Sequence, residues 1–106
     1  LALGILGLTV LAAATEWLID QGVRVMGIDQ WGWDLPFKAQ IAKAKRENNR
    51  EAFWEAHRVG CRKEYCHIEQ LTNLKALPPC GFKVAVFPLR IVGASAAPVR
   101  VVAIIE

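Results

Sequence analysis

The sequence has 106 residues, of which 54% are hydrophobic and 22% are charged, and its formal net charge is +3. This length corresponds to one small domain, and the composition excludes disordered, collagen-like and low-complexity chains. Eight of the 13 basic residues fall within residues 38–63, where they alternate with Glu47, Glu51 and Glu55. Because such alternation is typical of a solvated helix face, we expect no nucleic-acid partner.

The amino-terminal part of the chain predicts a helix followed by a strand. Apolar residues recur at helical spacing over residues 9–21, with Thr9 as the candidate N-cap and Gly22 where a C-terminal glycine belongs. Residues 23–28 are rich in β-branched side chains and end at Asp29, which indicates a strand. A helix, a glycine and a strand that ends at an acid are typical of α/β proteins, in which ligands often bind at that end of the strand.

The rest of the chain predicts a loop, charged helices, a turn and two more strands. Their ranges are 31–36 for an aromatic loop, 38–48 and 50–58 for helices, 71–79 for a turn, and 82–87 and 99–105 for strands, the first of them buried. The segment 61–70 is ambiguous. We therefore expect an α/β fold, with a mixed β-sheet and packed helices, in a single domain over residues 1–106. Residues 1–14 are apolar but shorter than the roughly 20 residues that span a bilayer, so no membrane contact is expected.

The three cysteines, Cys61, Cys66 and Cys80, are an odd number and cannot all pair within the chain. We expect free thiols and a cytoplasmic location. Together with His67 they could form a thiolate zinc site, although the spacing does not match the paired C-x2-C modules. The plainer interpretation is that they are small buried hydrophobic residues.

The two histidines, His57 and His67, are the side chains best suited to metal chemistry. His57 follows Phe53 by four positions, which would place both on one face of a short helix. Alternation along a strand would put His67 and Glu69 on the same face. Glu69 follows His57 by twelve residues, and the two could ligate one metal, although a lone histidine is more often a packed ring.

Two tryptophans, Trp31 and Trp33, follow the strand that ends at Asp29. They could line a substrate pocket, cover the end of the sheet or lie in a subunit interface. Asp29 and Asp34 flank them, but neither spacing nor context makes these two acids an acid/base pair.

Several segments of the chain together carry a family resemblance. They are residues 12–29 (AAATEWLIDQGVRVMGID), Asp34, residues 55–57 (EAH), residues 68–74 (IEQLTNL), residues 77–79 (LPP), and the closing segments 82–90 and 91–97. Through them the chain resembles the metal-dependent cyclase-family hydrolases, the superfamily that includes bacterial kynurenine formamidase and isatin hydrolase. The resemblance covers nearly all of the chain beyond residue 8. It implies part of that family's β/β/α fold and the hydrolysis of an amide or lactam C–N bond.

The resemblance also implies roles for individual residues. His57 and Glu69 would be ligands of a divalent metal, zinc or manganese. From their place after the strand that ends at Asp29, we also expect Trp31, Trp33 and Asp34 to contact a small amide or lactam substrate. His57 would end its helix, whose carboxyl terminus favours a cation. His67 has no counterpart in the family, so we expect it at most to contact one of the metal-coordinating residues. A homo-oligomer is also expected.

One departure from the family pattern limits the predicted activity. The motif H-x-G-T-H-x-D-x-P-x-H, which supplies the other metal ligands in the family, is absent from these 106 residues. The chain therefore matches the carboxyl-terminal half of the family. Because a site needs three or four protein ligands, two of them should leave the chain inactive by itself. The alternative function is a truncated, non-catalytic homologue that acts as an interaction or structural module.

Overall fold

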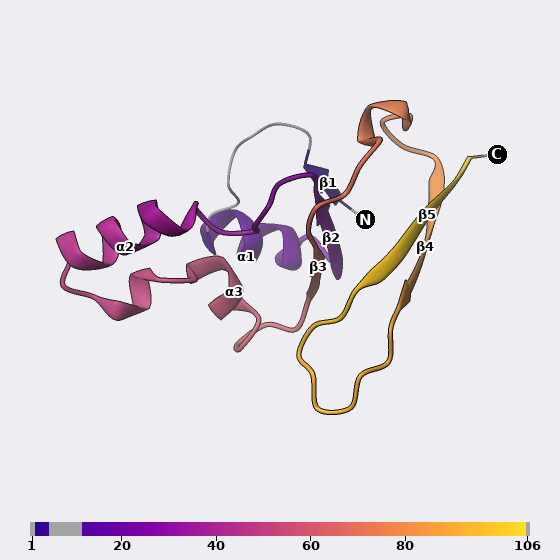
Figure 1. The fold of residues 1–106 in the computed structure, drawn as a ribbon. Coiled ribbons are helices and arrows are strands. Elements are labelled where there is room, and N and C mark those ends of the chain that lie inside the picture. The colour runs from indigo at the N-terminus through magenta and orange to yellow at the C-terminus, as the bar shows by residue number, and fades with distance from the viewer. Residues whose placement is uncertain (1, 5–11, 106) are drawn as a thin grey trace. The chain divides into compact units, whose positions relative to one another are not determined.

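A computed structural model of the protein describes residues 2–4 and 12–105. The chain forms two compact units, Leu1–Thr72 and Asn73–Glu106 (Figure 1). The first unit contains a small parallel sheet with helices, and the second contains an antiparallel strand pair. The predicted combination of helices and sheets is confirmed. Instead of one mixed sheet, however, the described residues form two sheets, one parallel and one antiparallel.

The sheet of the first unit consists of β1 (Ala2–Gly4), β2 (Val25–Ile28) and β3 (Cys66–Ile68), with β2 in the centre. Both strand pairs are parallel. Parallel neighbours require long crossover connections, and the helices of this unit provide them. Pairing in register joins Ala2 to Met26 and Gly4 to Ile28 on one side of β2, and Val25 to Cys66 and Gly27 to Ile68 on the other.

Helix α1 (Ala12–Asp20) connects β1 to β2 and ends at the predicted glycine. Gly22 has a φ of +90°, a left-handed conformation that favours glycine. The backbone N–H of Gly22 donates to the carbonyl of Ile19 at 2.9 Å, and that of Val23 donates to Leu18 at 3.1 Å. This pair of bonds is a Schellman motif, which satisfies the last carbonyls of the helix and turns the chain into β2.

Three helical segments connect β2 to β3: α2 (Phe37–Arg46), the short 3-10 helix η1 (Arg50–Ala52) and α3 (Glu55–Val59). The helix predicted over residues 50–58 is therefore interrupted. The interruption lies at Trp54, which adopts a left-handed φ of 61° immediately before α3. A bulky residue is strained in this conformation, so tertiary contacts must hold Trp54 there.

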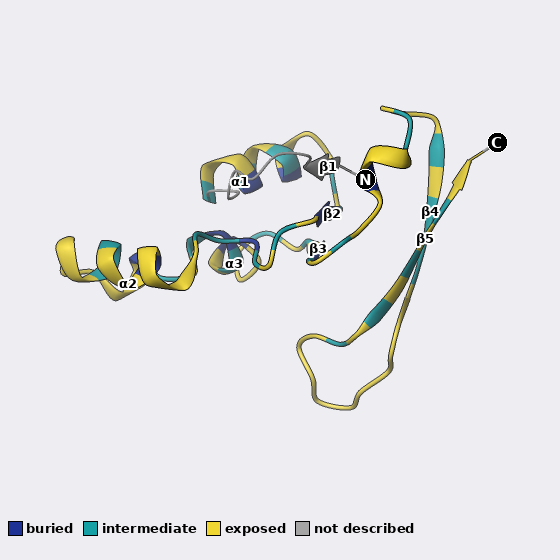
Figure 2. Ribbon diagram, turned by 45° about the horizontal axis from the view of Figure 1, so that its top comes forward, coloured by how far each residue is buried: buried dark blue, intermediate teal, exposed yellow. Residues whose placement is uncertain are grey.

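The core of the first unit lies between α1, β2, α3 and the loop that follows β2 (Figure 2). Its buried side chains are Ile19, Met26, Ile28, Trp33, Ala56 and Val59, with Leu18, Val23 and Tyr65 packed against them. Because α3 has only five residues, packing rather than intrinsic propensity stabilises it. The core therefore fixes the position of α3 relative to the end of β2.

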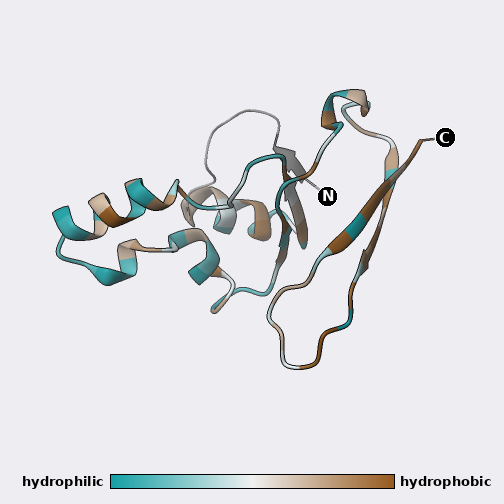
Figure 3. Cartoon of the chain, viewed as in Figure 1, coloured by the Kyte–Doolittle hydropathy of each residue, from teal (hydrophilic) through white to brown (hydrophobic). Residues whose placement is uncertain are grey.

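The second unit contains the 3-10 helix η2 (Leu74–Ala76) and the antiparallel pair of β4 (Phe82–Pro88) and β5 (Val99–Ile105). Phe82 pairs with Ile105, and the register continues to Pro88 opposite Val99. Figure 3 shows the largely apolar composition of this pair. Both predicted strands are confirmed, but the expectation that the first is buried is wrong, since its residues are half-buried or exposed.

Among the residues that the structure describes, no helix is both long enough and apolar enough to cross a membrane. Most of the apolar segment 1–14, including the candidate N-cap Thr9, lies outside the described residues.

Candidate metal centre

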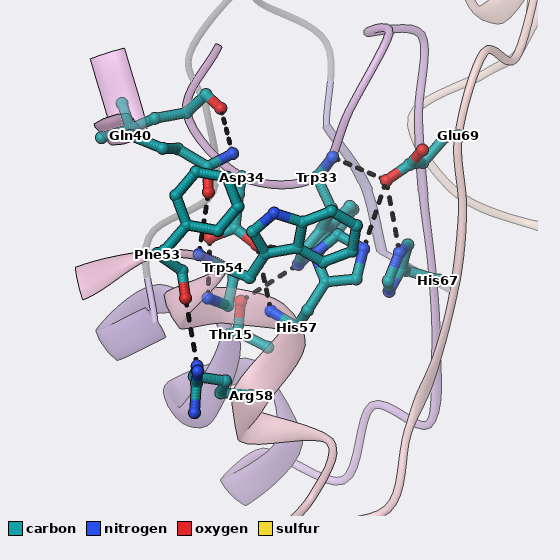
Figure 4. Close-up of polar contacts among 12 residues, drawn as sticks. Thr15, Trp33, Asp34, Gln40, Phe53, Trp54, His57, Arg58, His67 and Glu69 are labelled. Carbon is teal, nitrogen blue, oxygen red and sulfur yellow. Dashed lines mark hydrogen bonds and ion pairs between the residues drawn. The ribbon is translucent and has the colours of Figure 1, made fainter. Parts of the chain in front are cut away.

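Three side chains that can ligate a metal converge in the first unit (Figure 4). His57, His67 and Glu69 each offer one ligand atom, and these atoms lie within 4.8 Å of one another. Oε1 of Glu69 is 3.3 Å from Nε2 of His67 and 3.8 Å from Nε2 of His57. All three residues are half-buried, so a ligand could reach them from solvent.

The carboxyl end of the parallel sheet positions Glu69. His67 lies within β3, and Glu69 follows the last residue of that strand. The backbone beyond Glu69 is anchored to β2 and its loop, because the N–H of Gln70 donates to Gln30 at 2.9 Å and that of Leu71 donates to Ile28 at 3.0 Å. Strand alternation then turns His67 and Glu69 toward the same side, as the sequence predicts.

The loop after β2 holds both carboxylates near His57. The backbone N–H of Trp33 donates to Oε1 of Glu69 at 2.8 Å. Oδ2 of Asp34 lies 2.6 Å from Nδ1 of His57 and also accepts the backbone N–H of His57 at 3.1 Å, while Oδ1 accepts the N–H of Ala56 at 2.8 Å. Both oxygens of Asp34 are therefore bonded to protein groups.

Aromatic rings surround His67. The indole of Trp33 stacks on its ring with centroids 5.3 Å apart and an interplanar angle of 17°, and His57 meets it edge-on at 4.5 Å. Nε1 of Trp33 donates to Oγ1 of Thr15 at 3.2 Å, which fixes the stacked indole. Burial lowers the pKa of His67, the charge of His57 lowers it further, and Glu69 opposes both effects. A neutral imidazole is the form that binds metals.

The pKa values of two neighbouring groups are also shifted. Burial alone would raise the pKa of Asp34, but hydrogen bonds from the His57 ring and from the backbone of Ala56 and His57 hold it below its ordinary value. Tyr65 donates its hydroxyl to the carbonyl of Ala56 at 2.9 Å. Burial raises the pKa of Tyr65 to about 12, and the negative charges of Asp34 and Glu69 contribute.

A cavity of about 360 Å³ opens beside the cluster, and its lining includes Trp31, Trp33, Asp34, Trp54, His57 and Glu69. The three residues predicted to contact substrate thus all lie in its wall. They differ in exposure, since the side chain of Trp31 is 84% exposed and that of Trp33 only 2%. Trp31 is free to contact a ligand, whereas Trp33 mainly supports His67 and Glu69.

The donor set suits a divalent metal. Tetrahedral zinc with bonds of about 2.0–2.1 Å to nitrogen places its ligand atoms about 3.4 Å apart. The separations of 3.3 and 3.8 Å from Glu69 to the two histidines are near that value, and all three ligand atoms lie within 4.8 Å of one another. Two imidazoles and one carboxylate are also the ligands of catalytic zinc sites that keep a fourth position open.

Several predictions about these residues need correction. His57 does not end its helix but is its third residue, so the argument from the helix carboxyl terminus fails. Phe53 lies before α3, outside the helix that it was expected to share with His57. His67, expected only to contact a ligand, is itself one of the three clustered donors.

The cysteines are not among the clustered donors of the described residues. Cys61, Cys66 and Cys80 are free, as expected, but exposed, so their interpretation as buried hydrophobic residues is wrong. The donors that gather around His67 in the described part of the chain are an imidazole and a carboxylate rather than thiols. The structure therefore favours the histidine and glutamate site over a thiolate zinc site.

Comparisons of the chain with family models, curated proteins and solved structures found no match. The resemblance to the cyclase-family hydrolases therefore remains a prediction from the sequence.

Proposed function

We propose that the chain binds one divalent metal, preferably zinc, through His57, His67 and Glu69, as part of a hydrolase that cleaves amide or lactam C–N bonds. The observation that carries this proposal is the convergence of the three donors beside a cavity. A three-ligand site of this composition leaves a position for water or substrate. Manganese is the second candidate, because carboxylate and water ligands also suit it.

The lining of the cavity supports an uncharged, planar substrate. Trp31, Phe37 and Trp54 line the cavity and expose 84%, 61% and 44% of their surface. Such rings can pack against a planar group. Among the described residues of the lining there is no lysine or arginine that could neutralise an anion. An amide or lactam is both uncharged and planar at its C–N bond.

The chain's own residues would hold and orient the reacting groups. When bound, a divalent metal lowers the pKa of a coordinated water and polarises a carbonyl oxygen. The bond from the Trp33 N–H fixes the carboxylate of Glu69, and Asp34 fixes the ring of His57. Each titratable side chain of the lining, Asp34, His57 and Glu69, already contacts another protein group. Because the H-x-G-T-H-x-D motif is absent from the sequence, we expect no appreciable turnover by the chain alone.

The test combines metal loading with two hydrolysis assays. The metal-stripped chain is reconstituted with zinc or manganese, and formate release from formanilide and ring opening of isatin are followed. We expect no appreciable turnover by the chain alone, and metal-dependent turnover once a polypeptide carrying the H-x-G-T-H-x-D motif is added. The restored turnover should be lost in Glu69→Gln. Tight metal binding without hydrolysis under either condition would instead support the structural or interaction module.

The donor set also defines the main competing chemistry. Two histidines and one carboxylate hold non-haem Fe(II) in oxygenases. Preference for Fe(II) over zinc, together with oxygen consumption by the iron-loaded chain, would contradict the hydrolase proposal.

A further inference from the structure

We infer that Asp34 is the positioning residue of this centre, and that it sets the tautomer of His57 through the same carboxylate that caps α3. The inference rests on the proposed metal centre. It assigns Asp34 a role in orienting a ligand, in place of the substrate contact expected from the sequence.

The first argument is the missing local cap of α3. The N-cap residue Trp54 makes no side-chain cap bond. An N-cap oxygen ordinarily accepts the N–H of the second or third helical residue. Here Oδ1 of Asp34 accepts from Ala56 and Oδ2 from His57, which are those two residues. The carboxylate of Asp34, 22 residues before Ala56 in the chain, therefore takes the place of an N-cap side chain.

The second argument is the bond from the same carboxylate to the imidazole. Oδ2 of Asp34 lies 2.6 Å from Nδ1 of His57. An ionised carboxylate only accepts hydrogen bonds, so Nδ1 must carry the proton. In the neutral ring, the lone pair is then on Nε2, the atom 3.8 Å from Oε1 of Glu69. The backbone bond and the ring bond together fix where His57 lies and which nitrogen faces the cluster.

The side chain of Asp34 is well placed for this role, because only 9% of its surface is exposed. Little solvent competes for its oxygens, and both have protein partners. Replacement by asparagine keeps the size of the side chain but exchanges one acceptor for a donor. With its oxygen toward Ala56, the asparagine amide would donate to Nδ1 of His57, and the proton of the neutral ring would move to Nε2. The backbone N–H of His57 would lose its acceptor in this orientation.

The test measures the tautomer of His57 by nitrogen-15 NMR of the metal-free protein at pH 8.5, where imidazoles are ordinarily neutral. We expect the wild-type ring to be protonated at Nδ1, and the ring in Asp34→Asn to be protonated mainly at Nε2. Zinc affinity should fall by about tenfold or more in Asp34→Asn, as for other groups that orient a ligand. Val59→Ala is the matched control, because it weakens the packing of α3 but removes none of the hydrogen bonds of Asp34.

The outcomes separate this inference from the proposed function. A wild-type ring protonated at Nε2, or an unchanged tautomer in folded Asp34→Asn, would overturn the inference. A switch of tautomer in Val59→Ala would overturn it as well, because helix stability alone would then control the ring. The wild-type measurement decides the matter if Asp34→Asn does not fold. Failure of the wild-type chain to bind zinc, with the expected tautomers observed, would contradict only the proposed metal centre.

Discussion

Nε2 of His67 and Oε1 of Glu69 lie 3.3 Å apart, and the two residues are two positions apart in the sequence. Strand β3 ends between them, and its alternation turns both toward His57 on α3. This local pair and one side chain from a helix form a three-donor group that could hold a metal ion.

Loss of the His67 ring should weaken metal binding as much as loss of His57. We expect His67→Ala to lower zinc affinity by about tenfold or more, because one of three ligands is removed. Isothermal titration of the folded variants measures the effect. Cys66→Ala is the matched control, since Cys66 is the exposed neighbour on the other side of the strand. Equal losses of zinc affinity in His67→Ala and Cys66→Ala would contradict the assignment of His67.

Lowering the pH should destabilise the metal-free first unit through His67. The folded state keeps the pKa of His67 below its ordinary value of about 6.5, so the unfolded chain takes up the proton first. Stability is then highest above pH 6.5 and falls as the pH drops toward the lowered value. Asp34 contributes stability at pH values above its ordinary pKa. This contribution is lost only at more acidic pH, because the pKa of Asp34 is lowered in the folded state.

Urea unfolding in a chelator between pH 8 and pH 5 measures this dependence, with His67→Gln as the comparison. The variant should show a flatter dependence than the wild type over that range. Identical slopes would show that His67 does not carry the effect.

The single tyrosine gives a direct optical signal of the packing behind the site. Tyr65 should titrate with a pKa of about 12 in the folded protein, well above the ordinary value of about 10. Absorbance at 295 nm during an alkaline titration records it, and circular dichroism shows whether the fold persists. A folded protein in which Tyr65 ionises near pH 10 would contradict the described burial.

Gln40 should be the main support of the strained Trp54. Its buried side chain donates to the carbonyl of Leu35 at 2.6 Å and accepts the backbone N–H of Trp54 at 2.8 Å. Gln40→Ala removes both bonds and leaves partly buried groups unsatisfied, so we expect a loss of about 2 kcal/mol in the free energy of unfolding. Lys38→Ala, at an exposed position of the same helix, should change it by less than about 0.5 kcal/mol. Similar losses would argue against this role of Gln40.

Sequence patterns predicted the features that depend only on residues close together in the chain. Gly22 was identifiable because a left-handed helix end demands glycine, and the alternation of His67 and Glu69 needed only a strand. The break at Trp54 could not be predicted, since a bulky residue reaches a left-handed φ only through tertiary contacts, such as the hydrogen bond from the N–H of Trp54 to Gln40. Interpreting residues 50–58 as one helix then misplaced His57 at a carboxyl terminus.

Contacts between elements far apart in the sequence could not be predicted from local patterns either. The apolar runs 82–87 and 99–105 are compatible both with central strands of one sheet and with a separate two-stranded sheet. Hydrophobic periodicity does not determine which strands pair with each other. The bonds of Asp34 to Ala56 and His57 span 22 and 23 residues, and no spacing rule links them. The resemblance to the cyclase family singled out His57, Asp34 and Glu69 but gave His67 no ligand role.

The most direct test of the central claim is the zinc content of the purified chain after reconstitution and gel filtration. Zinc content and zinc affinity are measured in the wild type, three ligand variants and two cysteine controls. The account predicts one zinc per wild-type chain and about tenfold or greater losses of affinity in each of His57→Ala, His67→Ala and Glu69→Gln. Cys61→Ala and Cys80→Ala should bind as the wild type does. Zinc that survives all three substitutions, or that is lost with the cysteines instead, would contradict the account.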